Sequence, residues 1–137
     1  MSDKKITFPH MGNYYIPISY LIKKITKQQV IVPPKITKKT IEIGSVHSPD
    51  YVCVPFKYNL GNFIESLDLG ANVIFQAGGG CRYGYYAELQ EQILNDLGYN
   101  YEFINFIENN HVSLKKIYNY AKSCNPQLNI IKYAYYL

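Results

Sequence analysis

The sequence predicts an α/β fold in which a mostly parallel sheet lies between two layers of helices. Short apolar runs alternate along the chain with longer amphipathic runs, which is typical of βαβ units. The run NVIFQAG at residues 72–78 is almost continuously apolar, as expected for a central strand covered on both faces. A chain of 137 residues has room for one such domain, so we expect a single α/β domain over 1–137.

In the first half of the chain we expect a strand, a helix, a short strand and a short helix, at residues 5–10, 13–25, 28–34 and 36–44. Pro17 falls near the first turn of the first helix, where proline is tolerated. Pro33 and Pro34 close the short β-branched strand, because proline cannot continue a ladder. Gly44 is expected to end the short helix.

In the second half we expect a brief apolar stretch at 51–56, helices at 57–70, 83–99 and 112–124, and strands at 72–78 and 101–107. Gly70 and Gly98 are expected to stop the first two of these helices. Residues 128–137 fit either a strand or the start of another helix.

Composition and charge exclude several classes of protein. Apolar residues make up 47% of the chain and charged residues 18%, so a packed core is expected and disorder is not. The net charge of +4 is modest and the chain has a single arginine, which disfavours a nucleic-acid partner. No apolar run is long enough to span a bilayer, and the first residues do not resemble a signal peptide. We therefore expect a cytoplasmic protein without a membrane partner.

The loop AGGGCRYG at residues 77–84 combines glycines with Cys81 and Arg82 at the carboxyl end of the clearest strand. Ligands of open α/β sheets bind beyond the carboxyl ends of the strands. The segments PHMGN at 9–13 and CVPFKYNLGN at 53–62 are expected to lie at the same end. The sequence therefore predicts that three loops converge on one rim of the sheet.

The glycine-rich loop allows more than one chemistry. Its backbone N–H groups before a helix suit a phosphate, and the rigid fork of Arg82 suits an anion, although neither nucleotide-binding glycine motif is present. The alternative is a tight turn with Arg82 in a surface ion pair. Cys81 is expected at a helix N-terminus, which lowers the pKa of a thiol and favours a nucleophile or a metal ligand.

The other thiols and histidines give weaker signals. Cys53 is either a partner of Cys81 at a metal or a small buried apolar residue, and one pair of thiols does not close a metal site. Cys124 fits a helix-end cysteine without a role. His10 follows the first strand into the expected rim, whereas His47 and His111 read as loop residues.

Residues 37–98 resemble the 2-hydroxyacyl-CoA dehydratase and activase-related group, and more narrowly its small CoA-substrate-specific enzyme activase-related proteins. Recurring pieces of that group are a Cys-x-Pro-x-Lys segment, a glycine-bearing helix and a Gly-x-Cys-Arg-x-Gly-x-Tyr turn before a helix. They stand here as Cys53, Pro55, Lys57, Gly61, Gly79 or Gly80, Cys81, Arg82, Gly84 and Tyr86.

The resemblance implies a Rossmann-like three-layer domain that binds a [4Fe–4S] or related iron–sulfur cluster and acts in low-potential electron transfer or reductive activation. Carried over to this chain, Cys53 and Cys81 are the metal ligands, and Lys57, Gly79, Gly80 and Arg82 lie around the cofactor. An ATP-hydrolysing activator is the implied partner, and this chain carries no ATP-binding motif of its own. Members of the group are longer, so we expect one part of a larger architecture, completed by a second domain or a second copy.

Two other functions stay open on the residues alone. One is a binding or assembly domain whose cysteines carry no cluster. The other is a binder of CoA or a nucleotide that holds the phosphate through the glycine-rich loop.

Overall fold

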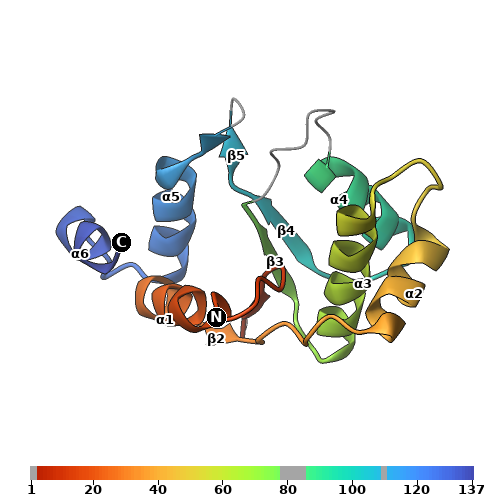
Figure 1. The fold of residues 1–137 in the computed structure, drawn as a ribbon. Helices are drawn as coiled ribbons and strands as arrows, with labels where there is room; N and C mark the ends of the chain where they lie inside the picture. The colour runs from red at the N-terminus through yellow and green to blue at the C-terminus, as the bar shows by residue number, and fades with distance from the viewer. Residues whose placement is uncertain (1–2, 78–85, 109–110) are drawn as a thin grey trace.

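A computed structural model describes residues 3–77, 86–108 and 111–137 (Figure 1). Its central element is a four-stranded sheet in the order β2-β1-β3-β4, in which every neighbouring pair is parallel. The strands are β1 (Lys5–Thr7), β2 (Gln29–Val30), β3 (Val73–Gln76) and β4 (Glu102–Asn105). The expected parallel α/β sheet flanked by helices is confirmed and is consistent with a Rossmann-like sandwich. Its strand order, 2-1-3-4, is the start of the 2-1-3-4-5 order of doubly-wound sheets and differs from the 3-2-1-4-5-6 order of the Rossmann fold itself.

The strand order reverses at β1. Ile6 of β1 pairs with Val30 of β2 on one side and with Val73 of β3 on the other. The chain therefore runs outward from β1 to β2, crosses back over β1 to β3, and continues outward to β4. At such a reversal the loops after the two central strands leave in opposite directions, and a crevice forms beyond their carboxyl ends.

Helices α1 (Tyr15–Thr26) and α5 (Leu114–Cys124) cover one face of the sheet (Figure 1). Their apolar side chains pack on Ile6, Val73 and Phe75. A short last helix, α6 (Ile130–Tyr136), packs against α1 and α5 through a separate cluster. Of the two structures expected for residues 128–137, a strand or a helix, the structure shows the helix. The Asn129 side chain caps α6 by accepting a hydrogen bond from the Lys132 N–H at 2.8 Å.

Helices α3 (Val54–Asp68) and α4 (Tyr86–Asp96) cover the other face, and α2 (Lys38–His47) packs on α3 outside them (Figure 1). Ile74 of β3 points into this layer, whereas its neighbours Val73 and Phe75 point into the first. Successive strand residues face opposite sides, so a strand covered by helices on both faces has to be apolar at each of these positions.

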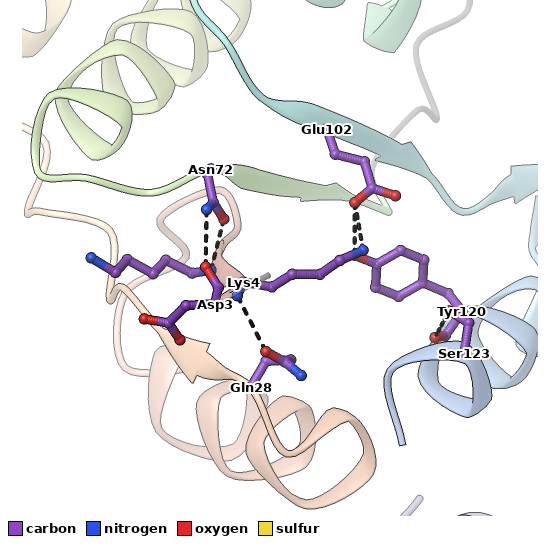
Figure 2. Close-up of polar contacts among 8 residues, drawn as sticks. Asp3, Lys4, Gln28, Asn72, Glu102, Tyr120 and Ser123 are labelled. Atoms are coloured by element: carbon purple, nitrogen blue, oxygen red, sulfur yellow. Dashed lines mark hydrogen bonds and ion pairs between the residues drawn. The ribbon is translucent and has the colours of Figure 1, made fainter. Parts of the chain in front are cut away.

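The amino ends of the strands are closed by polar contacts (Figure 2). The Lys4 ammonium lies 2.7 Å from the Glu102 carboxylate and donates to the Tyr120 hydroxyl at 3.1 Å. Asn72 accepts from the Lys5 N–H at 2.7 Å and donates to the Asp3 carbonyl at 3.1 Å. These contacts link the amino ends of β1, β3 and β4 to α5.

Most boundaries differ by a few residues from those expected from the sequence. The strands expected at 5–10 and 28–34 are shorter, because β1 ends at Thr7 and β2 covers only Gln29–Val30. Three further differences concern α2, α3 and β4. Helix α2 continues past Gly44 to His47, because the glycine faces α3 and does not stop the helix. Helix α3 begins at Val54, so the end of the apolar stretch 51–56 is its first turn, with Pro55 tolerated there. The predicted strand 101–107 ends at Asn105.

A side chain explains the early end of β4. The Asn105 carboxamide oxygen accepts a hydrogen bond from the Ile107 N–H at 3.0 Å, which turns the backbone out of the sheet. The chain then forms a small antiparallel pair, β5 (Ile107–Glu108) with β6 (His111–Val112), that the sequence analysis did not predict. Gly70 and Gly98 follow α3 and α4 with φ of +95° and +80°, as expected for helix stops. Among the described residues, no helix has both the length and the apolar character needed to cross a membrane.

Helices α2 and α3 touch through their backbones. A side chain on Gly44 would overlap the Lys57 carbonyl group, and one on Gly61 would overlap the Thr40 carbonyl group. Thr40 adds a hydrogen bond from its hydroxyl to the Glu65 carboxylate at 2.8 Å. Gly61 is therefore needed for helix packing, which explains its place in the glycine-bearing helix.

We predict that Gly61→Ala lowers the free energy of unfolding by about 1–3 kcal/mol, because the new methyl group forces two packed backbones apart. The better helix propensity of alanine offsets only about 1 kcal/mol of the gross cost. Urea denaturation followed by circular dichroism measures the change. The matched control Ser45→Ala, at an exposed position of α2, should stay within about 0.5 kcal/mol of the native protein. Equal stability of the two variants would contradict the backbone contact.

Candidate functional site

A cavity of about 630 Å³ lies at the carboxyl ends of β1 and β3, where the strand order reverses. Its lining includes residues 8–11 after β1, Cys53 and Pro55 at the start of α3, and Gln76 and Ala77 at the end of β3. Described residues from all three loops that we expected to converge thus line this cavity. The volume is within the range of small-molecule sites, and the position is the usual one for a ligand in an open α/β sheet.

The wall of the cavity between the sheet, α1 and α5 is apolar. It is formed by Ile18, Leu21, Ile22, Ile25, Phe75 and Ile117. The rim carries polar side chains from the loops and from α3, among them His10, Cys53, Tyr58 and Asn59. The site therefore has an apolar interior and a polar entrance.

Cys53 precedes the first turn of α3. Its carbonyl oxygen accepts hydrogen bonds from the N–H groups of Phe56 at 3.1 Å and Lys57 at 3.3 Å, and its thiol is exposed. The partial positive charge of the helix N-terminus favours an anion at this position. Cys53 is therefore placed to offer its sulfur atom to a ligand at the rim.

His10 is held at the rim by a buried amide. Asn62 of α3, which has no exposed surface, accepts a hydrogen bond from the His10 N–H at 3.1 Å and donates one to the Pro34 carbonyl at 2.8 Å. The amide thus ties the loop after β1 and the loop after β2 to α3. The Nδ1 atom of the His10 ring is buried and has no hydrogen-bond partner among the described residues.

A pair of buried amides joins the end of β3 to α4. The Gln76 side chain donates to the Gln90 carboxamide oxygen at 2.9 Å, and the two residues are 1% and 0% exposed. Ala77 and Tyr86, which lie on either side of residues 78–85, both line the cavity. Tyr86 packs edge-on against Phe56, with their ring centres 5.0 Å apart.

The structure places the predicted site residues as follows. Cys53 lines the cavity, and Lys57 is half-buried on α3 and does not line it. Gly79, Gly80, Cys81 and Arg82 lie outside the described residues.

The remaining cysteine and histidines lie elsewhere. Cys124 is buried at the end of α5, close to Tyr120 and away from the lining of the cavity. His47 ends α2 and His111 begins β6, and both are exposed. In residues 3–77, 86–108 and 111–137, no three His, Cys, Asp or Glu side chains come together as metal ligands.

The sequence analysis did not select the buried amides Asn62, Gln76 and Gln90. A usable signal was present for Asn62 and Gln76, because each stands in or beside an apolar run where a polar side chain needs a partner, whereas Gln90 lies in the polar stretch ELQEQ and gives no such signal. Asn62 interrupts LGNFI, and Gln76 ends VIFQ.

The raised tyrosine pKa values belong to structural contacts. Burial, with a smaller contribution from Glu91, raises the pKa of Tyr101 to about 12, and its hydroxyl donates to the Glu91 carbonyl at 3.0 Å. Burial, Cys124 and Glu102 raise the pKa of Tyr120. Both phenols stay protonated at neutral pH and serve as hydrogen-bond donors.

No protein-family model, curated protein or solved structure matches this chain. Its function has to be inferred from the site itself and from the motifs in its sequence.

We predict that Asn62→Ala lowers the free energy of unfolding by about 2 kcal/mol or more, because the His10 N–H and the Pro34 carbonyl both lose their partner. Hydrogen exchange should accelerate at the His10 amide in particular. Asn95→Ala, at an exposed position of α4, is the control and should change neither quantity. Unchanged protection of the His10 amide in Asn62→Ala would show that the amide does not hold this loop.

Proposed function

We propose that this chain is an iron–sulfur domain related to the 2-hydroxyacyl-CoA dehydratases, acting in low-potential electron transfer or reductive activation. In this proposal Cys53 and Cys81 ligate the cluster at the rim of the cavity. One observation carries the proposal: Cys53 lines the same cavity as Ala77 and Tyr86, the residues that bound the segment containing Cys81.

The chemistry of the donors supports this reading. Iron–sulfur clusters are held mainly by cysteine thiolates, and Cys53 presents an exposed thiol at a helix N-terminus. The segment 78–85 reads GGGCRYGY, so it adds a second thiol and the guanidinium of Arg82. A positive charge beside a thiolate-ligated cluster offsets its negative charge, and apolar neighbours such as Phe8 and Phe75 limit the access of water.

The chain does not supply a full ligand set in its described residues. Cys53 is the one thiol there that lines the cavity, since Cys124 is buried elsewhere. With Cys81 the chain offers two thiolates, and a cubane cluster takes four protein ligands. The other two would come from a second copy of the chain or from a partner domain, and an ATP-hydrolysing activator would supply the electron.

If a second copy completes the site, we predict that anaerobic reconstitution with iron and sulfide loads the native chain, and that Cys53→Ala and Cys81→Ala each lose most of the bound iron. Cys124→Ala removes a thiol that lies away from the cavity, so it is the matched control and should keep its iron. Iron, acid-labile sulfide and the charge-transfer spectrum are measured together on all four proteins.

The oligomeric state tests the source of the missing ligands. If a second copy completes the site, loading should convert monomers to dimers on gel filtration, with about four irons per two chains. If a partner domain completes it, the isolated chain should fail to load and a longer parent protein should load through both thiols. The assignment of the ligands would be contradicted if Cys53→Ala retained as much iron as the native chain, or if Cys124→Ala lost as much iron as Cys53→Ala.

A second candidate is a binding domain that carries no cluster. The size and apolar wall of the cavity favour it, because such a cavity fits an organic ligand with or without iron.

A further inference from the structure

We propose that the cavity and a smaller one beside it form a single binding site for an anionic amphiphile with a small head group, such as a straight-chain carboxylate. The alkyl chain would occupy the larger cavity and the carboxylate would face Lys35 in the smaller one. This inference does not rest on a bound cluster.

The smaller cavity has a volume of about 470 Å³ and lies against the loops after β1 and β2. Its lining includes His10, Gly12 and Asn13 from the first loop, and Val32, Pro33 and Lys35 from the second. His10 also lines the larger cavity, so the two spaces share this residue. In this proposal one elongated ligand passes His10 and occupies both spaces.

The larger cavity favours an apolar occupant. Protein interiors are normally packed to the density of organic crystals, with few voids larger than a water molecule. Here Ile22, Ile25 and Phe106 belong to the buried core, yet they border a space of about 630 Å³. Because their side chains offer no hydrogen bonds, water gains little there and an alkyl chain gains the free energy of burial.

The smaller cavity favours a negative charge. Lys35 is exposed and forms no ion pair with any described residue, whereas the nearby Lys38 is paired with Glu42 at 3.6 Å. Among the described residues that line this cavity there is no Asp or Glu. A carboxylate at this position would therefore meet an unpaired cation and no like charge.

His10 lies at the junction of the two spaces and requires a partner. Its Nδ1 atom is buried and has no hydrogen bond with any residue that the structure describes, while its backbone is fixed through Asn62. A buried polar atom of this kind normally has a partner in the functional state. A ligand oxygen near the junction would provide that partner.

Calorimetric titration of the iron-free chain with hexanoate, octanoate and decanoate tests the inference. Affinity should rise about fourfold for each added methylene group, because each is transferred from water to an apolar wall. Octan-1-ol has the chain of octanoate without its charge and should bind about threefold to fivefold more weakly than octanoate. Absence of decanoate binding at millimolar concentration, or an affinity independent of chain length, would overturn the proposal.

Substitutions assign the two ends of the ligand. Leu21→Trp adds bulk at a half-buried position of the wall and should weaken octanoate binding roughly tenfold or more, with Ile18→Trp as the second variant if the first does not fold. Lys35→Gln should lower octanoate affinity about threefold to fivefold and leave octanol affinity unchanged. Lys132→Gln removes the same charge from exposed α6 and is the control. Octanoate binding that is unaffected by the folded tryptophan variant, or equally affected by both lysine variants, would place the ligand elsewhere.

Failure of this test and failure of the iron–sulfur proposal are separable. The titrations use protein that has never been loaded with iron, and the iron measurements contain no amphiphile. Carboxylate binding by a chain that cannot hold iron would support the site described here and leave the chain as a binding domain.

Discussion

The two hydrogen bonds of Asn62 hold together the segments from which both cavities are built. Through them a helix on one face of the sheet is tied to the loop after β1 and to the loop after β2. The neighbours of this amide extend the link, since Gly61 meets the backbone of α2 and Phe63 packs in the core against Phe103 of β4. The consecutive residues Gly61, Asn62 and Phe63 thus connect α3 to α2, to the two rim loops and to the sheet.

The two edges of the sheet differ in how their polar groups are satisfied. At the amino edge, the Lys4 ammonium pairs with Glu102, and Asn72 forms hydrogen bonds with the backbones of Lys5 and Asp3 (Figure 2). At the carboxyl edge, the buried Nδ1 atom of His10 has no hydrogen-bond partner among the described residues, and the Cys53 thiol is exposed. The contacts of Lys4 and Asn72 and the larger cavity therefore lie at opposite ends of the same four strands.

The parts of the fold that depend on local patterns were predictable from the sequence. The apolar run of β3 identified the central strand, the glycines at 70 and 98 identified helix ends, and the end of β1 identified His10 as a rim residue. Gly44 was misread because a glycine that stops a helix and one that contacts another helix look alike in a sequence. The polar residue Asn62 within an apolar run gave a usable signal, but its partners could not be assigned, because the loops that it binds meet α3 only in the folded chain.

The amide pair of Gln76 and Gln90 has a consequence for how this domain can diversify. It fastens the end of a strand to the following helix just outside the eight residues between Ala77 and Tyr86, and both amides are buried in the protein interior. The hydrogen bond between Gln76 and Gln90 thus joins β3 to α4, the two elements that flank that segment. Because neither amide belongs to residues 78–85, a change of side chain within them removes no partner of this bond.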